Sequence, residues 1–218
     1  MARQSEEVAD RPEELGELGL KIAMFESPTA QNKMRPRNFT FTQNSLHLKL
    51  GDLKNLRKME IANMTVKVII VYESKYGNTK RVAETIMESL NEAGGIEASI
   101  RELKEVNPND VQNYDAILIG SPNHMGGPTR GIKKFIDKLG KLQLEGKVFA
   151  VFDTYMGKDF EKAVKKMEEK ISEKAPRLKK IADGLSIKVQ GIKGPIAEGE
   201  LQKCKEFGKN IATQLKKS

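Results

Sequence analysis

One stretch constrains the fold of this 218-residue chain more than any other: Val66–Thr79, with the sequence VKVIIVYESKYGNT. Its run Val68–Val71 is β-branched throughout, which is typical of a strand buried on both faces of a parallel sheet. The polar loop that follows ends where a helix is expected to begin, at Thr79. A helix N-terminus presents unpaired N–H groups and the positive end of the helix dipole. We therefore predict that this loop binds an anion such as phosphate.

Strand and helix patterns alternate from Val66 onward, which predicts βαβ units in one doubly wound α/β sheet with helices on both faces. Five strands are expected: the first around 68–71, then 97–103, 115–120, 147–152 and 185–189. A short helical turn is expected after Asn107-Pro108. The apolar faces of four longer helices are predicted on Val82, Ile86, Leu90 and Ala93; on Ile132, Phe135, Ile136 and Leu139; on Phe160, Val164, Met167 and Ile171; and on Leu201, Cys204, Phe207, Ile211 and Leu215.

In such a sheet, ligands bind beyond the carboxyl ends of the strands, where the strand order reverses. The loops after the first, third and fourth predicted strands emerge at that edge. The third strand is followed by Ser121–Gly127, which joins polar groups to two adjacent glycines, and the fourth by Asp153–Gly157, which places an aromatic between a hydroxyl and a glycine. Together the three loops predict a pocket with a phosphate end and a flat, partly apolar end.

Composition limits the class of protein. The chain contains one cysteine and two widely separated histidines, so no disulfide framework, metal site or nucleophilic triad is indicated. No apolar run is long enough to span a membrane, and the acidic N-terminal residues are unlike a secretory signal, so we expect a soluble, cytoplasmic protein. The formal net charge is +8. Because lysines alternate with glutamates, as in KDFEKAVKKMEEKISEK, and no nucleic-acid motif is present, we interpret the charge as a solvated surface without a nucleic-acid partner.

Residues 1–63 differ from the rest: an acidic opening, a turn-rich middle and one alternating segment that would suit a small hairpin. Two interpretations stay open, a poorly ordered or loosely packed extension and a docked partner-binding segment. We expect the core domain to comprise residues 64–218. Met64 could be the natural start, a hypothesis that the intact mass of the native protein would test.

The loop SKYGNT resembles the FMN-phosphate loop of the flavodoxin family, whose usual pattern is Ser/Thr, any residue, Thr/Tyr, Gly, Asn, Thr. GSPNHMGGP followed by KKFIDKL is similar to the family's second flavin loop and the helix after it. The resemblance, to flavodoxins of the short-chain type, extends from Val66 to about Leu215. It implies a flavodoxin-like fold with the strand order 2-1-3-4-5.

The resemblance also implies roles for the loop residues. The FMN phosphate would be held by Ser74, Tyr76, Asn78 and Thr79, with the backbone of Lys75 and Gly77. The flavin ring would be flanked by Ser121, Pro122, Asn123, His124, Met125, Gly126 and Gly127. The carbonyl of Gly126 or Gly127 would accept a hydrogen bond from reduced N5. Tyr155 would stack on the ring, with Asp153, Thr154 and Gly157 as polar and backbone contacts. The chain departs from many flavodoxins in lacking tryptophan, with His124 or Met125 in the corresponding region, and in being basic.

The implied function is FMN-dependent electron transfer through a semiquinone to redox partner proteins, with acidic partners favoured by the positive charge. The alternative is an FMN-dependent NAD(P)H:quinone oxidoreductase acting on small quinone and nicotinamide substrates. Both stay open at this point. A phospho-receiver of the same architecture is excluded, because Glu73-Ser74 and Gly120-Ser121 stand where its aspartates are needed. Because positive charge stabilises the anionic hydroquinone, we predict a semiquinone/hydroquinone potential less negative than in acidic flavodoxins, which an anaerobic redox titration would test.

Overall fold

The computed structural model describes residues 65–217. The predicted extension 1–63 and the boundary at Met64 lie outside these residues. The strands are β1 (Val66–Tyr72), β2 (Ile96–Glu102), β3 (Ala116–Pro122), β4 (Val148–Tyr155), β5 (Lys179–Lys180) and β6 (Leu185–Lys188). The helices are α3 (Asn78–Glu92), α4 (Arg130–Leu139), α5 (Lys162–Lys174) and α6 (Glu200–Leu215), with short 3₁₀ turns η3 (Leu103–Glu105) and η4 (Pro108–Asn113).

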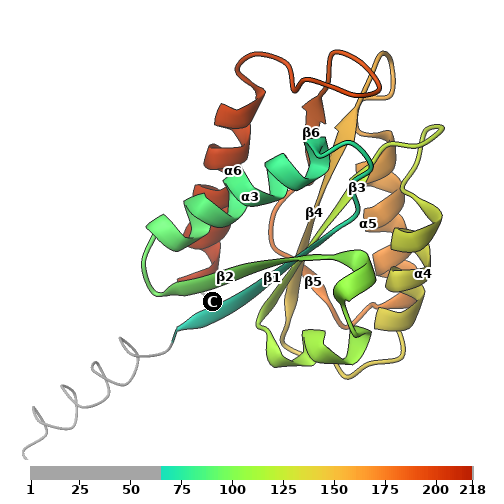
Figure 1. Cartoon of the computed structure of the whole chain (residues 1–218). Coiled ribbons are helices and arrows are strands. Elements are labelled where there is room, and N and C mark those ends of the chain that lie inside the picture. The colour runs from blue at the N-terminus through green and yellow to red at the C-terminus, as the bar shows by residue number, and fades with distance from the viewer. Residues whose placement is uncertain (1–64, 218) are drawn as a thin grey trace, which may run out of the picture. The chain divides into compact units, whose positions relative to one another are not determined.

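The sheet is parallel and has the order β2-β1-β3-β4-β5, which confirms the predicted fold. Helices α3 and α6 pack together on one face, and α4 and α5 on the other (Figure 1). The β-branched run of β1 contributes to both cores: Val68 and Ile70 pack beneath α3 and α6, whereas Ile69 and Val71 pack beneath α4 and α5. Its lack of polar alternation therefore reflects burial on both faces.

The last position in the sheet differs from the predicted single strand. It is filled by two short strands: β5 pairs with the beginning of β4, and β6 pairs with its end, from Phe152↔Leu185 to Tyr155↔Lys188. Gly184 lies between them, and a Cβ there would collide with the side chain of Val164 on α5. The sequence did not predict β5, because its two exposed lysines carry no apolar pattern.

Phe160 was predicted on the buried face of the helix that corresponds to α5, and this prediction was wrong. The helix begins only at Lys162, after Glu161 with a positive φ of 59°. Phe160 precedes this break and is 55% exposed, whereas Val164, Met167 and Ile171 are buried as expected. No helix in the part of the chain that the structure describes is long and apolar enough to span a membrane.

Candidate functional site

The predicted phosphate loop lies between β1 and α3, and its backbone leaves the start of α3 uncapped. Gly77 has a φ of 87° and precedes the first helical residue, Asn78. Its carbonyl accepts from the Arg81 N–H at 2.9 Å, and its own N–H donates to Ser74 Oγ at 3.1 Å. No side chain caps α3, and its first turn contains no acidic residue. The first-turn N–H groups of α3 are therefore directed at a position where an external anion could accept from them.

Helix α4 begins differently. Thr129 Oγ1 accepts from the Ile132 N–H at 3.3 Å, which caps the helix, and donates to Glu73 Oε2 at 2.6 Å. The Thr129 N–H in turn donates to Ser121 Oγ at 3.0 Å. Thr129 thus fixes the end of β1 and both ends of the second loop. Neither Glu73 nor Thr129 was predicted as a site residue, although a threonine three residues before an apolar helical position is a recognisable capping signal.

The hydroxyl of Thr79 points into the protein. Thr79 Oγ1 lies 3.0 Å from Thr154 Oγ1, and both side chains are buried. Thr79 lies in the first turn of α3, next to the first loop, and Thr154 lies at the end of β4, in the third loop. The hydrogen bond between them therefore joins two predicted binding loops that are far apart in sequence.

The second loop closes in a tight turn. Met125 and Gly126 both have positive φ, of 52° and 74°, and the His124 N–H donates to the Gly127 carbonyl at 2.8 Å. Asn123 supports the turn, because its Oδ1 accepts from the Gly126 N–H at 3.0 Å. The Gly127 carbonyl is thus engaged, while the Gly126 carbonyl has no hydrogen-bond partner among residues 65–217. Of the two carbonyls predicted to accept from flavin N5, that of Gly126 is available.

Asp153 is fully buried at the end of β4. Its Oδ2 accepts from the Val164 N–H at 3.2 Å, near the start of α5, and its Oδ1 has no partner in the described chain. Burial raises the pKa of Asp153 to about 6, and the Ser186 hydroxyl and the amides of Val164 and Ala163 oppose that rise. Asp153 therefore acts within the described chain as an internal cap of α5, next to the third loop.

The aromatic group of the third loop packs against a neighbour. The rings of Tyr155 and Phe160 have their centroids 5.4 Å apart in an edge-on arrangement. Burial raises the pKa of the half-buried Tyr155 hydroxyl, and Glu200 adds to the effect. Met156, which follows Tyr155 in the sequence, is 45% exposed. Neither Met156 nor Phe160 was predicted as a site residue.

The exposed large apolar side chains of residues 65–217 gather at one end of the sheet. They follow β1, β3, β4 and β6, whose carboxyl ends lie together (Figure 1), and they are Tyr76, Met125, Met156, Phe160 and Ile192. The loop that carries Ile192 also reaches the phosphate loop, because a Cβ on Gly194 would lie 2.5 Å from Asn78 Oδ1. This fourth loop was not predicted as part of the site, although its two glycines and its proline indicate a turn.

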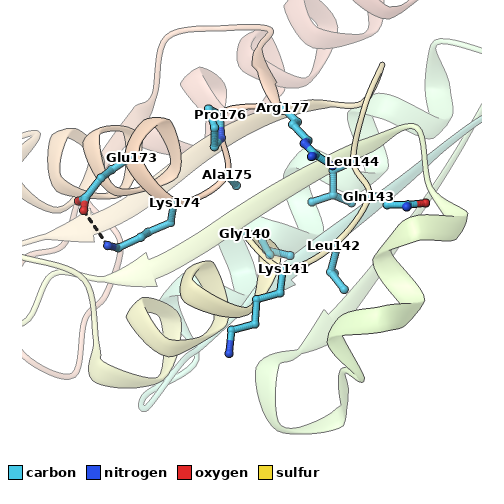
Figure 2. A pocket seen from close by; sticks show the side chains of 11 residues that line it. Gly140, Lys141, Leu142, Gln143, Leu144, Glu173, Lys174, Ala175, Pro176 and Arg177 are labelled. Carbon is cyan, nitrogen blue, oxygen red and sulfur yellow. Dashed lines mark hydrogen bonds and ion pairs between the residues drawn. The ribbon is translucent and has the colours of Figure 1, made fainter.

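A hollow of about 550 Å³ lies elsewhere, at the end of the sheet where β4 and β5 begin (Figure 2). It is lined by the segments Leu139–Leu144 and Glu173–Arg177, with the Glu173–Lys174 ion pair at its rim. None of its residues belongs to the predicted binding loops. It therefore contributes nothing to the candidate site.

Comparisons with known proteins agree with the predicted fold. Residues 69–187 match the sequence model of the flavodoxin domain family. A flavodoxin from Clostridium saccharobutylicum is 36% identical over 89 residues, which is 41% of this chain and 56% of that protein. An NAD(P)H dehydrogenase (quinone) from Archaeoglobus fulgidus is 30% identical over 115 residues, 39% of this chain and 60% of the relative. The matches thus span little more than half the length of these relatives. The solved structure of a flavodoxin from the domain Archaea has a TM-score of 0.60 at 28% identity and covers 69% of this chain and 99% of its own.

Proposed function

Because this chain belongs to the flavodoxin family, whose members bind FMN, we propose that it is an FMN-dependent electron-transfer protein. FMN supplies the electron chemistry when bound, and the protein tunes it by hydrogen bonds and charge. The observation that carries the proposal is the coincidence, at one end of the sheet, of an uncapped helix N-terminus and the exposed apolar side chains of four loops. We expect the protein to act in the cytoplasm with redox partner proteins.

The first loop fits a phosphate group. Its donors are the first-turn amides of α3 and the Ser74 hydroxyl, whose oxygen already accepts from Gly77 and whose proton remains available. A Cβ on Gly77 would meet nothing within 4 Å, so the space over the loop is open. A phosphate bound here would gain charge-assisted hydrogen bonds and the helix dipole without needing a side-chain cation.

The other loops fit a flat, partly apolar ring. Met125 and Met156 supply exposed thioether side chains, and Tyr76 supplies an exposed aromatic face. Methionine adapts its shape and makes favourable contacts with aromatic rings, which offers a physical substitute for the absent tryptophan. The available carbonyl of Gly126 would accept a hydrogen bond from a protonated ring nitrogen.

A second function is favoured by one specific observation. The Archaeoglobus fulgidus relative is named an NAD(P)H dehydrogenase (quinone), so oxidation of NAD(P)H with a quinone as acceptor is the alternative. Steady-state oxidation of NADH and NADPH in the presence of a quinone separates the two functions. Turnover supports the enzyme, whereas FMN reduction in two separate one-electron steps without turnover supports the carrier.

The cofactor proposal is tested by titrating the FMN-free protein with FMN and with riboflavin, which lacks the phosphate. We expect FMN to bind at least about tenfold more tightly, because only FMN engages the amides of α3. Gly77→Ala should weaken FMN binding, since alanine disfavours the positive φ, and should leave riboflavin binding nearly unchanged. Gly95→Ala is the matched control, with a φ of 66° and equally open surroundings at the start of β2. Protein that binds no FMN, or binds FMN and riboflavin equally, contradicts the proposal.

A further inference from the structure

Helices α4 and α5 carry an uneven distribution of positive charge beside the second loop. Four of the five lysines of α5 form ion pairs with carboxylates in the described structure: Lys162 with Asp159 at 2.6 Å, Lys165 with Glu161 at 3.0 Å, Lys170 with Asp137 at 2.5 Å and Lys174 with Glu173 at 2.7 Å. The fifth, Lys166, has no carboxylate partner among residues 65–217. Lys166 is therefore the one lysine of α5 without an ion pair among residues 65–217.

Lys133 of α4 converges on the same point. A Cβ on Gly127 would lie 3.7 Å from Lys166 Nζ and 4.0 Å from Lys133 Nζ. Lys133, like Lys166, forms no ion pair within the described chain. We call Lys133 and Lys166 the lysine pair. It places two positive charges against the double glycine of the second loop.

The next turn of α4 and α5 contains an ion pair between the two helices, which the lysine pair lacks. Asp137 and Lys170 follow the two members of the lysine pair by four residues each, and they form an ion pair that joins α4 to α5. Residues four apart lie one above the other on a helix surface. On α4 and α5, the helical turn farther from the second loop therefore holds the opposite charges of Asp137 and Lys170. The turn beside the second loop holds the two like charges of the lysine pair. Like charges repel, and a negative group from outside would relieve that repulsion.

The neighbourhood of the lysine pair has the features of a protein interface. Met125, in the same loop, is 91% exposed. An apolar centre with a charged rim is the usual anatomy of a protein–protein contact.

We propose that the lysine pair and Met125 form a docking surface for an acidic redox protein, whose carboxylates pair with Lys133 and Lys166. The proposal rests on the proposed function, since docking here would place the partner beside the loops expected to hold FMN. The attraction between opposite charges would act mainly by raising the rate of association, and it would weaken as salt is added.

The test measures binding of an acidic plant-type [2Fe–2S] ferredoxin to the full chain by calorimetry, at low and at moderate ionic strength. We expect the double variant Lys133→Glu/Lys166→Glu to bind at least about tenfold more weakly, with a smaller dependence on salt. Lys133→Gln/Lys166→Gln should lose less. The matched control is Lys205→Glu/Lys209→Glu, which makes the same change in net charge at exposed positions on α6, across the sheet. It should bind nearly as well as the unmodified chain.

Three outcomes would overturn the docking surface. The first is that the unmodified chain shows no binding to the ferredoxin. The second is that the α6 variant loses as much affinity as the lysine-pair variant, which would mean that only net charge matters. The third is that the lysine-pair variants lose affinity for NADPH and not for the ferredoxin, which would indicate a dinucleotide site. Circular dichroism confirms that each variant is folded. Because the ferredoxin titration is run on both FMN-free and FMN-loaded protein, a failure to bind FMN would reject the proposed function separately.

Discussion

Replacing Asp153 with asparagine is expected to flatten the pH dependence of the protein's stability between pH 5 and pH 7. The carboxyl group is fully buried, and burial raises its pKa from 3.8 to about 6. An acid whose pKa is raised in the folded state favours folding when it is protonated. Its contribution is complete below the unfolded pKa of 3.8 and is lost as the pH rises through about 6.

The magnitude follows from the two pKa values. At pH 7, where the unfolded chain is ionised, Asp153 lowers the free energy of unfolding by about 3 kcal/mol relative to the fully protonated state. At pH 5 the penalty is about 1.6 kcal/mol, so the unmodified protein should gain about 1.3 kcal/mol from this residue between pH 7 and pH 5. Asparagine keeps an oxygen for the Val164 N–H but buries an amide without an assured partner, which costs about 1–3 kcal/mol at every pH.

The assay is urea unfolding followed by circular dichroism at pH 5, 6 and 7. The measured quantity is the difference in unfolding free energy between Asp153→Asn and the unmodified protein, in which the contributions of other carboxylates cancel. This difference should favour the variant by about 1.3 kcal/mol more at pH 7 than at pH 5. Asp110→Asn, at an exposed position in η4, is the control for the loss of a carboxylate that is not buried. A pH-independent difference for Asp153→Asn would refute the reasoning.

Three further predictions concern single residues. Thr79→Val removes a buried hydroxyl and leaves that of Thr154 without its partner, so it should lower the free energy of unfolding by about 1–3 kcal/mol in urea; an unchanged midpoint and slope would contradict this. Gly140→Ala should lower the free energy of unfolding by roughly 1–3 kcal/mol or more, and with it Tm, because the new Cβ would collide with the backbone carbonyl of Lys174. A Tm equal to that of the unmodified protein would show that the loop adapts freely. Burial raises the pKa of the Cys204 thiol to about 12, so alkylation at pH 8 should be roughly a thousandfold slower in folded protein than in urea; comparable rates would disprove the burial.

Much of the fold could be predicted because it depends on local patterns. The β-branched run of β1 and the helical spacing of Ile132, Phe135, Ile136 and Leu139 record burial directly, and both elements form where expected. Phe160 shows the limit of such patterns. Phe160 has the apolar spacing of α5 but precedes the helix, because the backbone at Glu161 has a positive φ and α5 begins only at Lys162. The apolar periodicity of the sequence does not indicate this break.

The candidate site also has features that the local sequence predicts and features that depend on tertiary packing. The order of residues from Ser74 to Thr79 was enough to predict a phosphate loop, since a glycine before a helix N-terminus is a local arrangement. That Thr79 bonds to Thr154 and that Asp153 caps α5 depend on segments joined only by the packing of α3 and α5 on the sheet. No short-range pattern contains that information.

By itself, the sequence determined the alternation of strands and helices, the strand order implied by the family resemblance, and the three loops at the carboxyl edge. The tertiary structure alone decided which polar groups those loops keep for themselves, how the last strand is divided, and that Lys133 and Lys166 converge without a carboxylate between them. The physical reason is the range of the forces involved. Burial of apolar side chains imposes a periodicity that each segment carries along its own length, whereas hydrogen bonds and ion pairs depend on distances between segments that are set only when the helices pack on the sheet.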